Sequence, residues 1–204
     1  MNKNKKSKKR DLERKIIKSI LHFLVVIVYR PKIINENKIP KDEGVILCAN
    51  HVHALDSAVI VLCSKRQICF MAKEELFKNK FIKWIANLFG VFPVKRGKQD
   101  IEAMKSSLRV LKEKKILGIF PEGTRNGLAK QVKVKSGAVY MAISAGVKIV
   151  PVAIMGSFKP FTRVTVTYLD PIDYFHLKGT KPSKEELDKM TMEVMGKIED
   201  ELVK

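Results

Sequence analysis

Short apolar runs alternate with segments of helical periodicity along most of the chain. Continuous apolar runs of this length are typical of buried strands, and they occur at residues 44–49, 67–72, 90–94, 116–120 and 149–155. Apolar residues at helical spacing, with capping residues at some ends, predict helices at residues 57–64, 78–89, 100–114 and 136–145. Strands that alternate with helices favour a single α/β domain, in which helices flank a mainly parallel central sheet.

The C-terminal third adds one strand and one helix. Residues 164–168 alternate Val and Thr, which is typical of an edge strand or of a strand buried on one face. Ser183 and Glu186 have capping-box spacing and predict the start of a final helix that ends near Leu202.

The N-terminal region differs from the rest in composition. Residues 1–10 are a basic, low-complexity arm that we expect to be disordered, and residues 11–29 predict a helix that Pro31 terminates. The longest uninterrupted apolar run in this helix, residues 23–29, is too short to cross a bilayer. We therefore expect residues 1–30 to form a basic arm and a membrane-interface helix, and residues 31–204 to form the main domain.

The net charge of +19 restricts the partners of the protein. Such an excess of positive charge indicates an anionic partner, which leaves a nucleic acid, an anionic membrane surface or a phosphorylated substrate. Aromatic residues are not interleaved with the basic ones, and no nucleic-acid recognition motif is present, so a nucleic-acid-binding module is the less favoured alternative. The three cysteines lack CxxC spacing and are expected to be small buried side chains.

His51 and Asp56 form the first candidate site, because they follow the predicted strand at residues 44–49. A carboxylate at this spacing can orient the imidazole and leave its other nitrogen free to accept a proton from a hydroxyl. The alternatives are a surface histidine beside a helix N-cap, or a metal site that adds His53. The metal alternative is weak, because Asp56 lies one position late for the HxHxDH pattern of metallo-hydrolases and no histidine follows it. No metal or cofactor is expected.

Two further segments contain candidate anion-binding residues. Residues 120–126 read Phe-Pro-Glu-Gly-Thr-Arg-Asn, a turn whose backbone N–H groups and Arg125 suit a phosphate. Residues 90–97 read Gly-Val-Phe-Pro-Val-Lys-Arg-Gly and place Arg96 at the end of a predicted strand. Taken singly, each segment is also consistent with an ordinary solvated turn or a solvated basic loop.

The segments together resemble a known family. In chain order, the Asn-His-x4-Asp (HX4D) segment, the Gly-x5-Arg segment, Phe-Pro-Glu-Gly-Thr-Arg and Ile-Val-Pro-Val-Ala are similar to the four motif blocks of the glycerolipid acyltransferases. The most similar type is the 1-acylglycerol-3-phosphate (lysophosphatidate) acyltransferases. Lys73 also matches a lysine that the family carries between the first two blocks. The resemblance spans roughly residues 40–155.

The resemblance implies acyl transfer from an acyl thioester, carried by acyl carrier protein or coenzyme A, to the free hydroxyl of lysophosphatidate. Glycerol-3-phosphate or another lyso-lipid is the alternative acceptor. His51 is then the base that Asp56 orients. Candidate phosphate ligands are Lys73, Arg96 and Arg125, and the candidates for substrate or oxyanion positioning are Glu122, Gly123 and Thr124. Glu122 is expected to orient Arg125 or to bind a substrate hydroxyl.

Such substrates place the enzyme at an anionic membrane surface, as a peripheral or monotopic protein on the cytoplasmic face of the cell membrane. The arm and the helix after it supply charge and apolar area for that contact. The segment with Trp84, Leu88 and Phe89 is either a second membrane face or ordinary core.

Overall fold

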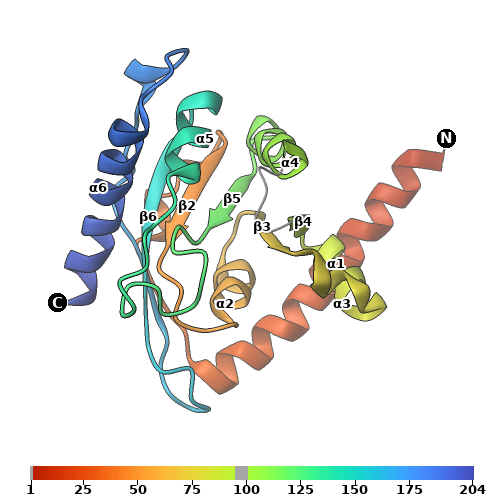
Figure 1. Ribbon diagram of the computed structural model, residues 1–204. Helices are drawn as coiled ribbons and strands as arrows, with labels where there is room; N and C mark the ends of the chain where they lie inside the picture. The colour runs from red at the N-terminus through yellow and green to blue at the C-terminus, as the bar shows by residue number, and fades with distance from the viewer. Residues whose placement is uncertain (1, 95–100) are drawn as a thin grey trace.

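The computed structural model describes residues 2–94 and 101–204 and has an open sheet with helices on both faces (Figure 1). The strands are β1 (Lys32–Ile34), β2 (Val45–Ala49), β3 (Ile68–Lys73), β4 (Phe92–Val94), β5 (Ile116–Ile119), β6 (Lys148–Met155) and β7 (Thr165–Tyr168). The α-helices are α1 (Asn2–Tyr29), α2 (Asp56–Cys63), α3 (Lys80–Leu88), α4 (Ile101–Lys112), α5 (Gly137–Ala145) and α6 (Lys184–Leu202). Short 3-10 helices lie at Glu36–Lys38, Glu74–Lys78 and Phe175–Leu177.

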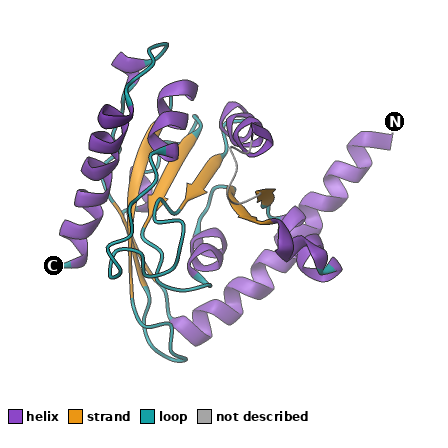
Figure 2. Cartoon of the chain, in the orientation of Figure 1, coloured by secondary structure: helices purple, strands orange, loops and turns teal. Residues whose placement is uncertain are grey.

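The sheet has the strand order β1-β7-β6-β2-β5-β3-β4. Neighbouring strands are parallel in every pair except β6 and β7, which are antiparallel. The predicted α/β architecture with a mainly parallel sheet is therefore confirmed, and Figure 2 shows the alternation of helix and strand on which the prediction depended. Because β2 and β5 are parallel neighbours, the segments that follow them emerge at the same edge of the sheet.

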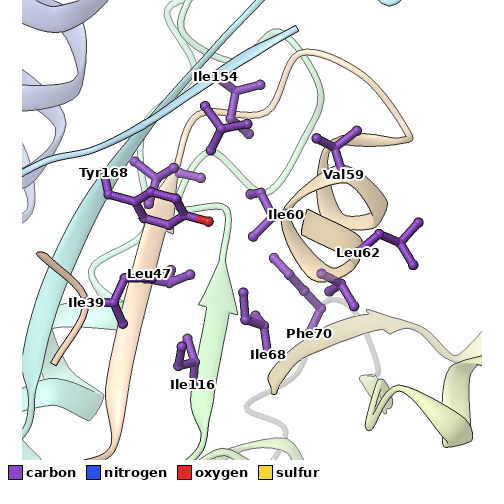
Figure 3. Packing of buried hydrophobic residues seen from close by; sticks show 14 of the residues in the cluster. Ile39, Leu47, Val59, Ile60, Leu62, Ile68, Phe70, Ile116, Ile154 and Tyr168 are labelled. Carbon is purple, nitrogen blue, oxygen red and sulfur yellow. The ribbon is translucent and has the colours of Figure 1, made fainter. Parts of the chain in front are cut away.

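Strand β2 is apolar throughout because helices cover both of its faces. Val45, Leu47 and Ala49 belong to the core cluster on the α2 side. Ile46 and Cys48 belong to the cluster formed with α4, α5 and α6. Figure 3 shows the first cluster, in which Leu47, Ile116 and Tyr168 of the sheet pack with Ile60 of α2. The two clusters fix β2 in the centre of the molecule, directly before the HX4D segment.

Two strands differ from the sequence prediction. Residues 164–168 were expected to form an edge strand or a strand buried on one face, but β7 lies between β1 and β6, and the consecutive residues Val166, Thr167 and Tyr168 are all buried. The edge strand is β1, which pairs in parallel with β7. It has only three residues, too few to show a period of two, and it follows Pro31 directly.

Helix α1 also differs from its prediction, because it begins at Asn2 and includes the arm that was expected to be disordered. The arm is rich in lysine, which has a good helix propensity, and residues 1–29 contain no Pro or Gly. The helix ends at Tyr29, as Pro31 predicted. One side of its C-terminal half packs against the α2 side of the core, through Ile17, Leu21, Val25 and Tyr29.

Helix α6 starts with the predicted capping box. The Ser183 hydroxyl accepts from the Glu186 N–H at 3.2 Å, and the Glu186 carboxylate accepts from the Ser183 N–H at 2.7 Å. The helix then packs Val194, Met195 and Ile198 against the sheet.

Replacing Ser183 by Ala removes one of these two bonds, so the free energy of unfolding should fall by about 1 kcal/mol. Chemical denaturation of both proteins measures this difference. Ser144→Ala is the matched control, because Ser144 is an exposed residue inside α5, where Ala is the better helix former. Equal losses for the two variants would contradict the role of the capping box.

Candidate active site

The segments that follow β2 and β5 meet at the carboxyl edge of the sheet and are joined by two hydrogen bonds. The His51 N–H donates to Oε1 of Glu122 at 2.8 Å, and the Asn126 N–H donates to the His51 carbonyl at 2.6 Å. The first and third motif segments are therefore one structural unit.

Asp56 orients the imidazole of His51. Nδ1 of His51 lies 2.7 Å from Oδ2 of Asp56, and the same oxygen accepts from the N–H groups of Val52 at 2.7 Å and His53 at 2.8 Å. Because this oxygen already acts as the acceptor for two backbone N–H groups, Nδ1 is assigned as the donor in the His51 contact. The lone pair of neutral His51 is then on Nε2.

The burial of the two side chains differs in a way that suits these contacts. The Asp56 side chain is completely buried, whereas the His51 side chain is 19% exposed. Asp56 is also the first residue of α2, where the helix dipole stabilises a negative charge. Its other oxygen, Oδ1, has no hydrogen-bond partner within the described residues. The fixed carboxylate therefore lies inside the domain, and the imidazole remains accessible from outside.

Phe120 holds the imidazole from the other side. The His51 and Phe120 rings stack with centroids 4.1 Å apart and an interplanar angle of 13°. Phe120 stacks in turn on Phe70, with ring centroids 5.3 Å apart. These contacts restrict the ring of His51 to the plane in which Nδ1 meets Asp56.

Glu122 is buried and binds the backbone. It is 2% exposed, and besides the His51 N–H it accepts the Leu128 N–H at 3.0 Å through Oε2. Gly127 makes room for it, since a Cβ atom at Gly127 would lie 2.5 Å from Oε2. Across the described residues, Glu122 forms no ion pair with Arg125, which is exposed. Glu122 therefore holds the segment after β5 against the segment after β2. Its hydrogen-bond partners are His51 and Leu128, and not the expected Arg125.

The structure describes three of the four remaining predicted residues, Gly123, Thr124 and Lys73. The Gly123 N–H donates to the Phe120 carbonyl at 3.0 Å, within a turn where Gly123 has a φ of +63°. The Thr124 N–H has no protein acceptor in the described part of the chain. Lys73 is exposed at the end of β3. Arg96 lies outside the described residues.

His53 belongs to a different set of contacts from His51. Its ring stacks on Phe158 with centroids 4.7 Å apart, and Phe158 lies against Tyr29 of α1 at 5.7 Å. The Leu55 N–H donates to Nδ1 of His53 at 3.3 Å. The loop that contains Phe158 is also linked to the end of α1 by two backbone hydrogen bonds. The Phe161 N–H donates to the Val28 carbonyl, and the Val164 N–H donates to the Tyr29 carbonyl. The HX4D segment is thereby attached to the N-terminal helix.

These contacts do not support the metal alternative. His51 and His53 stack on different aromatic rings, and each Nδ1 already has a partner within the loop. In the part of the chain that the structure describes, no group of three or more His, Cys, Asp or Glu side chains is arranged to hold a metal ion.

The cysteine thiols are poorly placed for nucleophilic chemistry. Burial raises the pKa of the Cys48 thiol to about 12 and that of Cys63 to about 11. Burial also raises the pKa of Cys69. Thiols with raised pKa values are protonated at neutral pH, so none of the three supplies a thiolate.

The sequence assigned no role to four residues of the site: Asn50 and Phe120, which lie within motif segments, and Phe158 and Gly127, which do not. Asn50 is buried, and its side-chain amide exchanges two hydrogen bonds with the backbone of Ile154, at 2.9 and 2.7 Å. This contact extends the pairing of β2 with β6 by one residue. The polar residue directly after a buried strand was a signal for Asn50. The ring partners of Phe120 and Phe158 are remote in sequence, whereas Gly127 lies five residues from Glu122 and its role depends on the burial of that side chain.

Comparisons with known proteins identify the family to which the chain belongs. A family model described as "Acyltransferase" matches residues 30–155. The chain is 33% identical over 179 residues to the 1-acyl-sn-glycerol-3-phosphate acyltransferase of Bacillus subtilis, an alignment that covers 83% of this chain and 86% of the relative. The enzyme of that name from Streptococcus pneumoniae is 36% identical over 71% of this chain, which spans 56% of the length of that relative.

One solved structure extends the similarity to the whole fold. It is the crystal structure of the 1-acyl-sn-glycerophosphate (LPA) acyltransferase PlsC from Thermotoga maritima. The TM-score is 0.69 at 26% identity, and the match covers 98% of this chain and 84% of that one. Since the family model matches more than half of the chain and the Bacillus relative is similar over most of its length, this chain belongs to the acyltransferase family.

Proposed function

We propose that this protein transfers an acyl group from an acyl thioester to the free hydroxyl of 1-acyl-sn-glycerol-3-phosphate, giving phosphatidate for phospholipid synthesis. The names of the Bacillus and Streptococcus relatives support this acceptor. The observation that carries the proposal is the 2.7 Å contact of His51 Nδ1 with the buried Asp56 carboxylate, which leaves Nε2 free as a base.

A thioester is already activated toward attack, so the reaction does not require a nucleophile on the enzyme. It requires a base that takes the proton from the acceptor hydroxyl. Nε2 of His51 takes the proton of the acceptor hydroxyl as its oxygen attacks the thioester carbonyl carbon. The tetrahedral intermediate collapses with cleavage of the C–S bond, and the leaving thiolate takes the proton from the imidazolium. Asp56 stabilises the imidazolium between these steps.

The turn at residues 121–125 is the proposed site for the developing oxyanion and for part of the acceptor. The Thr124 N–H is the better oxyanion donor, because the Gly123 N–H already binds Phe120. Arg125, Lys73 and Arg96 remain the proposed phosphate ligands. Glu122 acts by holding the turn against His51.

The protein is proposed to work at an anionic membrane surface, attached to one leaflet. None of the described helices combines the length and the apolarity that crossing a membrane requires. Yet α1 exposes large apolar side chains on the side that does not pack on the core: Leu12, Ile16, Ile20, Phe23, Leu24, Val26 and Ile27. Apolar exposure of this kind, on a helix rich in lysine, is typical of interfacial attachment.

Helix α3 contributes to the same surface. Phe81 is 68% exposed and Trp84 is 45% exposed, whereas Leu88 and Phe89 are buried in the core. Leu88 and Phe89 therefore belong to the core, and the proposed second membrane face is confined to Phe81 and Trp84. Trp84 and Leu88 line a hollow together with Glu13 of α1, so the exposed residues of α3 lie beside α1.

The function is tested by giving the purified full chain acyl-coenzyme A and acyl-acyl carrier protein, each with a panel of acceptors, and by identifying products by mass. Phosphatidate from lysophosphatidate is the expected product. Turnover of glycerol-3-phosphate in preference to lysophosphatidate would contradict the proposed acceptor. The absence of any acyl transfer would contradict the reaction itself.

His51→Ala should lower turnover by about 10²–10⁴, because it removes the proposed base. Steady-state kinetics with detergent-dispersed acceptor measure this loss, and a thermal melt checks that the variant is folded. Asp56→Asn should also lower turnover, since an amide cannot hold Nδ1–H in the same way. His53→Ala is the control and should be clearly milder. The reverse order of severity for the two histidines would refute the assignment.

Ile20→Ser combined with Phe23→Ser should reduce the bound fraction of protein in co-sedimentation with anionic vesicles. Each side chain contributes about 1.5–3 kcal/mol when it is fully buried in an apolar phase, so affinity should fall at least tenfold. Met192→Ser is the control, since Met192 is also exposed but lies on α6. High salt should release the unaltered protein only in part, because salt screens charge and leaves apolar burial intact. Equal binding of both variants, or preferential binding to DNA, would contradict attachment through α1.

A further inference from the structure

The side chain of Lys135 lies across Gly123, in the turn that follows β5. A Cβ atom built on Gly123 would be 3.3 Å from Cε and 3.4 Å from Nζ of Lys135. The backbone of Lys135 is held there too, because its N–H donates to the Pro121 carbonyl at 2.9 Å. Lys135 is nevertheless exposed. The ammonium group is therefore positioned by the turn and open to solvent.

The charge of Lys135 is not used by the protein itself. In the described ranges, Lys135 makes no ion pair and its ammonium has no hydrogen-bond acceptor. Lys133, two residues earlier, instead pairs with Asp188 of α6 at 3.2 Å. The nearest acid in the turn is Glu122, and its two oxygens are occupied by the N–H groups of His51 and Leu128. A cation without a carboxylate partner is suited to bind an anionic ligand.

A short series of contacts connects this ammonium to the catalytic base. The His51 ring stacks on Phe120 at 4.1 Å, the Phe120 carbonyl accepts the Gly123 N–H at 3.0 Å, and Lys135 lies against Gly123. In the acceptor, the free hydroxyl and the phosphate ester are on neighbouring glycerol carbons. When the hydroxyl is at His51, the phosphate is only a few bonds away, and the 121–125 turn is one of the surfaces that it can reach.

We propose that Lys135 is a further substrate-binding residue, whose ammonium group binds the phosphate of the acceptor, and that Gly123 is required partly because a side chain there would displace it. The inference rests on the proposed function in one respect, namely that the acceptor is a phosphomonoester. It assigns to the turn a cation, Lys135, that lies outside all four motif segments. A charge-assisted contact with phosphate is the strong kind of hydrogen bond, and lysine makes it as a point charge.

Lys135→Gln should raise the KM for lysophosphatidate by about tenfold to a hundredfold, with kcat and the KM for the acyl donor unchanged. Detergent-dispersed acceptor should be used, so that membrane attachment does not enter the measurement. Lys135→Arg keeps the charge and should restore most of the affinity. Lys133→Gln removes the same charge from a neighbouring exposed lysine and should leave the acceptor KM unchanged. An equal rise in both glutamine variants would mean that only the general positive charge matters, and would overturn the proposal.

A phosphate-free acceptor and free inorganic phosphate make the test specific. Monoacylglycerol should be used equally poorly by the unaltered protein and by Lys135→Gln, and inorganic phosphate should inhibit the variant less. Calorimetric binding of glycerol-3-phosphate to the full chain gives a readout without turnover. Weaker binding by the variant supports the proposal even if lysophosphatidate proves to be the wrong acceptor. Unchanged binding overturns it whatever the reaction.

Discussion

The Asp56 carboxylate is the group on which the geometry of the site depends most. One of its oxygens accepts hydrogen bonds from the imidazole of His51 and from the N–H groups of Val52 and His53, so it sets both the fold of the HX4D loop and the direction of the His51 imidazole. A buried negative charge is costly unless donors surround it. Three donors and the first turn of α2 meet that need, and the loop has little freedom to adopt another conformation.

Most of the sheet could be predicted from the sequence, for a physical reason. Strands β2, β5 and β6 are buried on both faces, so each is a continuous apolar run whose length alone distinguishes it from a helix. Strand β1 has no such signal, because three residues cannot show a period and its first residue is exposed. The position of β7 inside the sheet depends on β1, and for that reason it could not be predicted either.

The site was predictable where its contacts are local. His51 and Asp56 are five residues apart, and their spacing already indicated the contact that the structure contains. The partners of Glu122 were not predictable in the same way, because His51 and Leu128 approach it only after β2 and β5 have paired. From the sequence alone, the expected partners of Glu122 are Arg125, three residues away, or a substrate hydroxyl. The close approach of Lys135 to Gly123 spans a loop and had no sequence signal.

The ring contacts of Phe158 with Tyr29 and His53 have a consequence for the position of the site relative to α1. They fasten the end of α1 to the HX4D loop, together with the backbone bonds from Phe161 and Val164. The end of α1 is thereby joined to the loop that also holds His51. In the attachment proposed above, the fold itself then sets the distance between α1 and the imidazole, and this distance determines how far the headgroup of an acceptor must extend to reach Nε2.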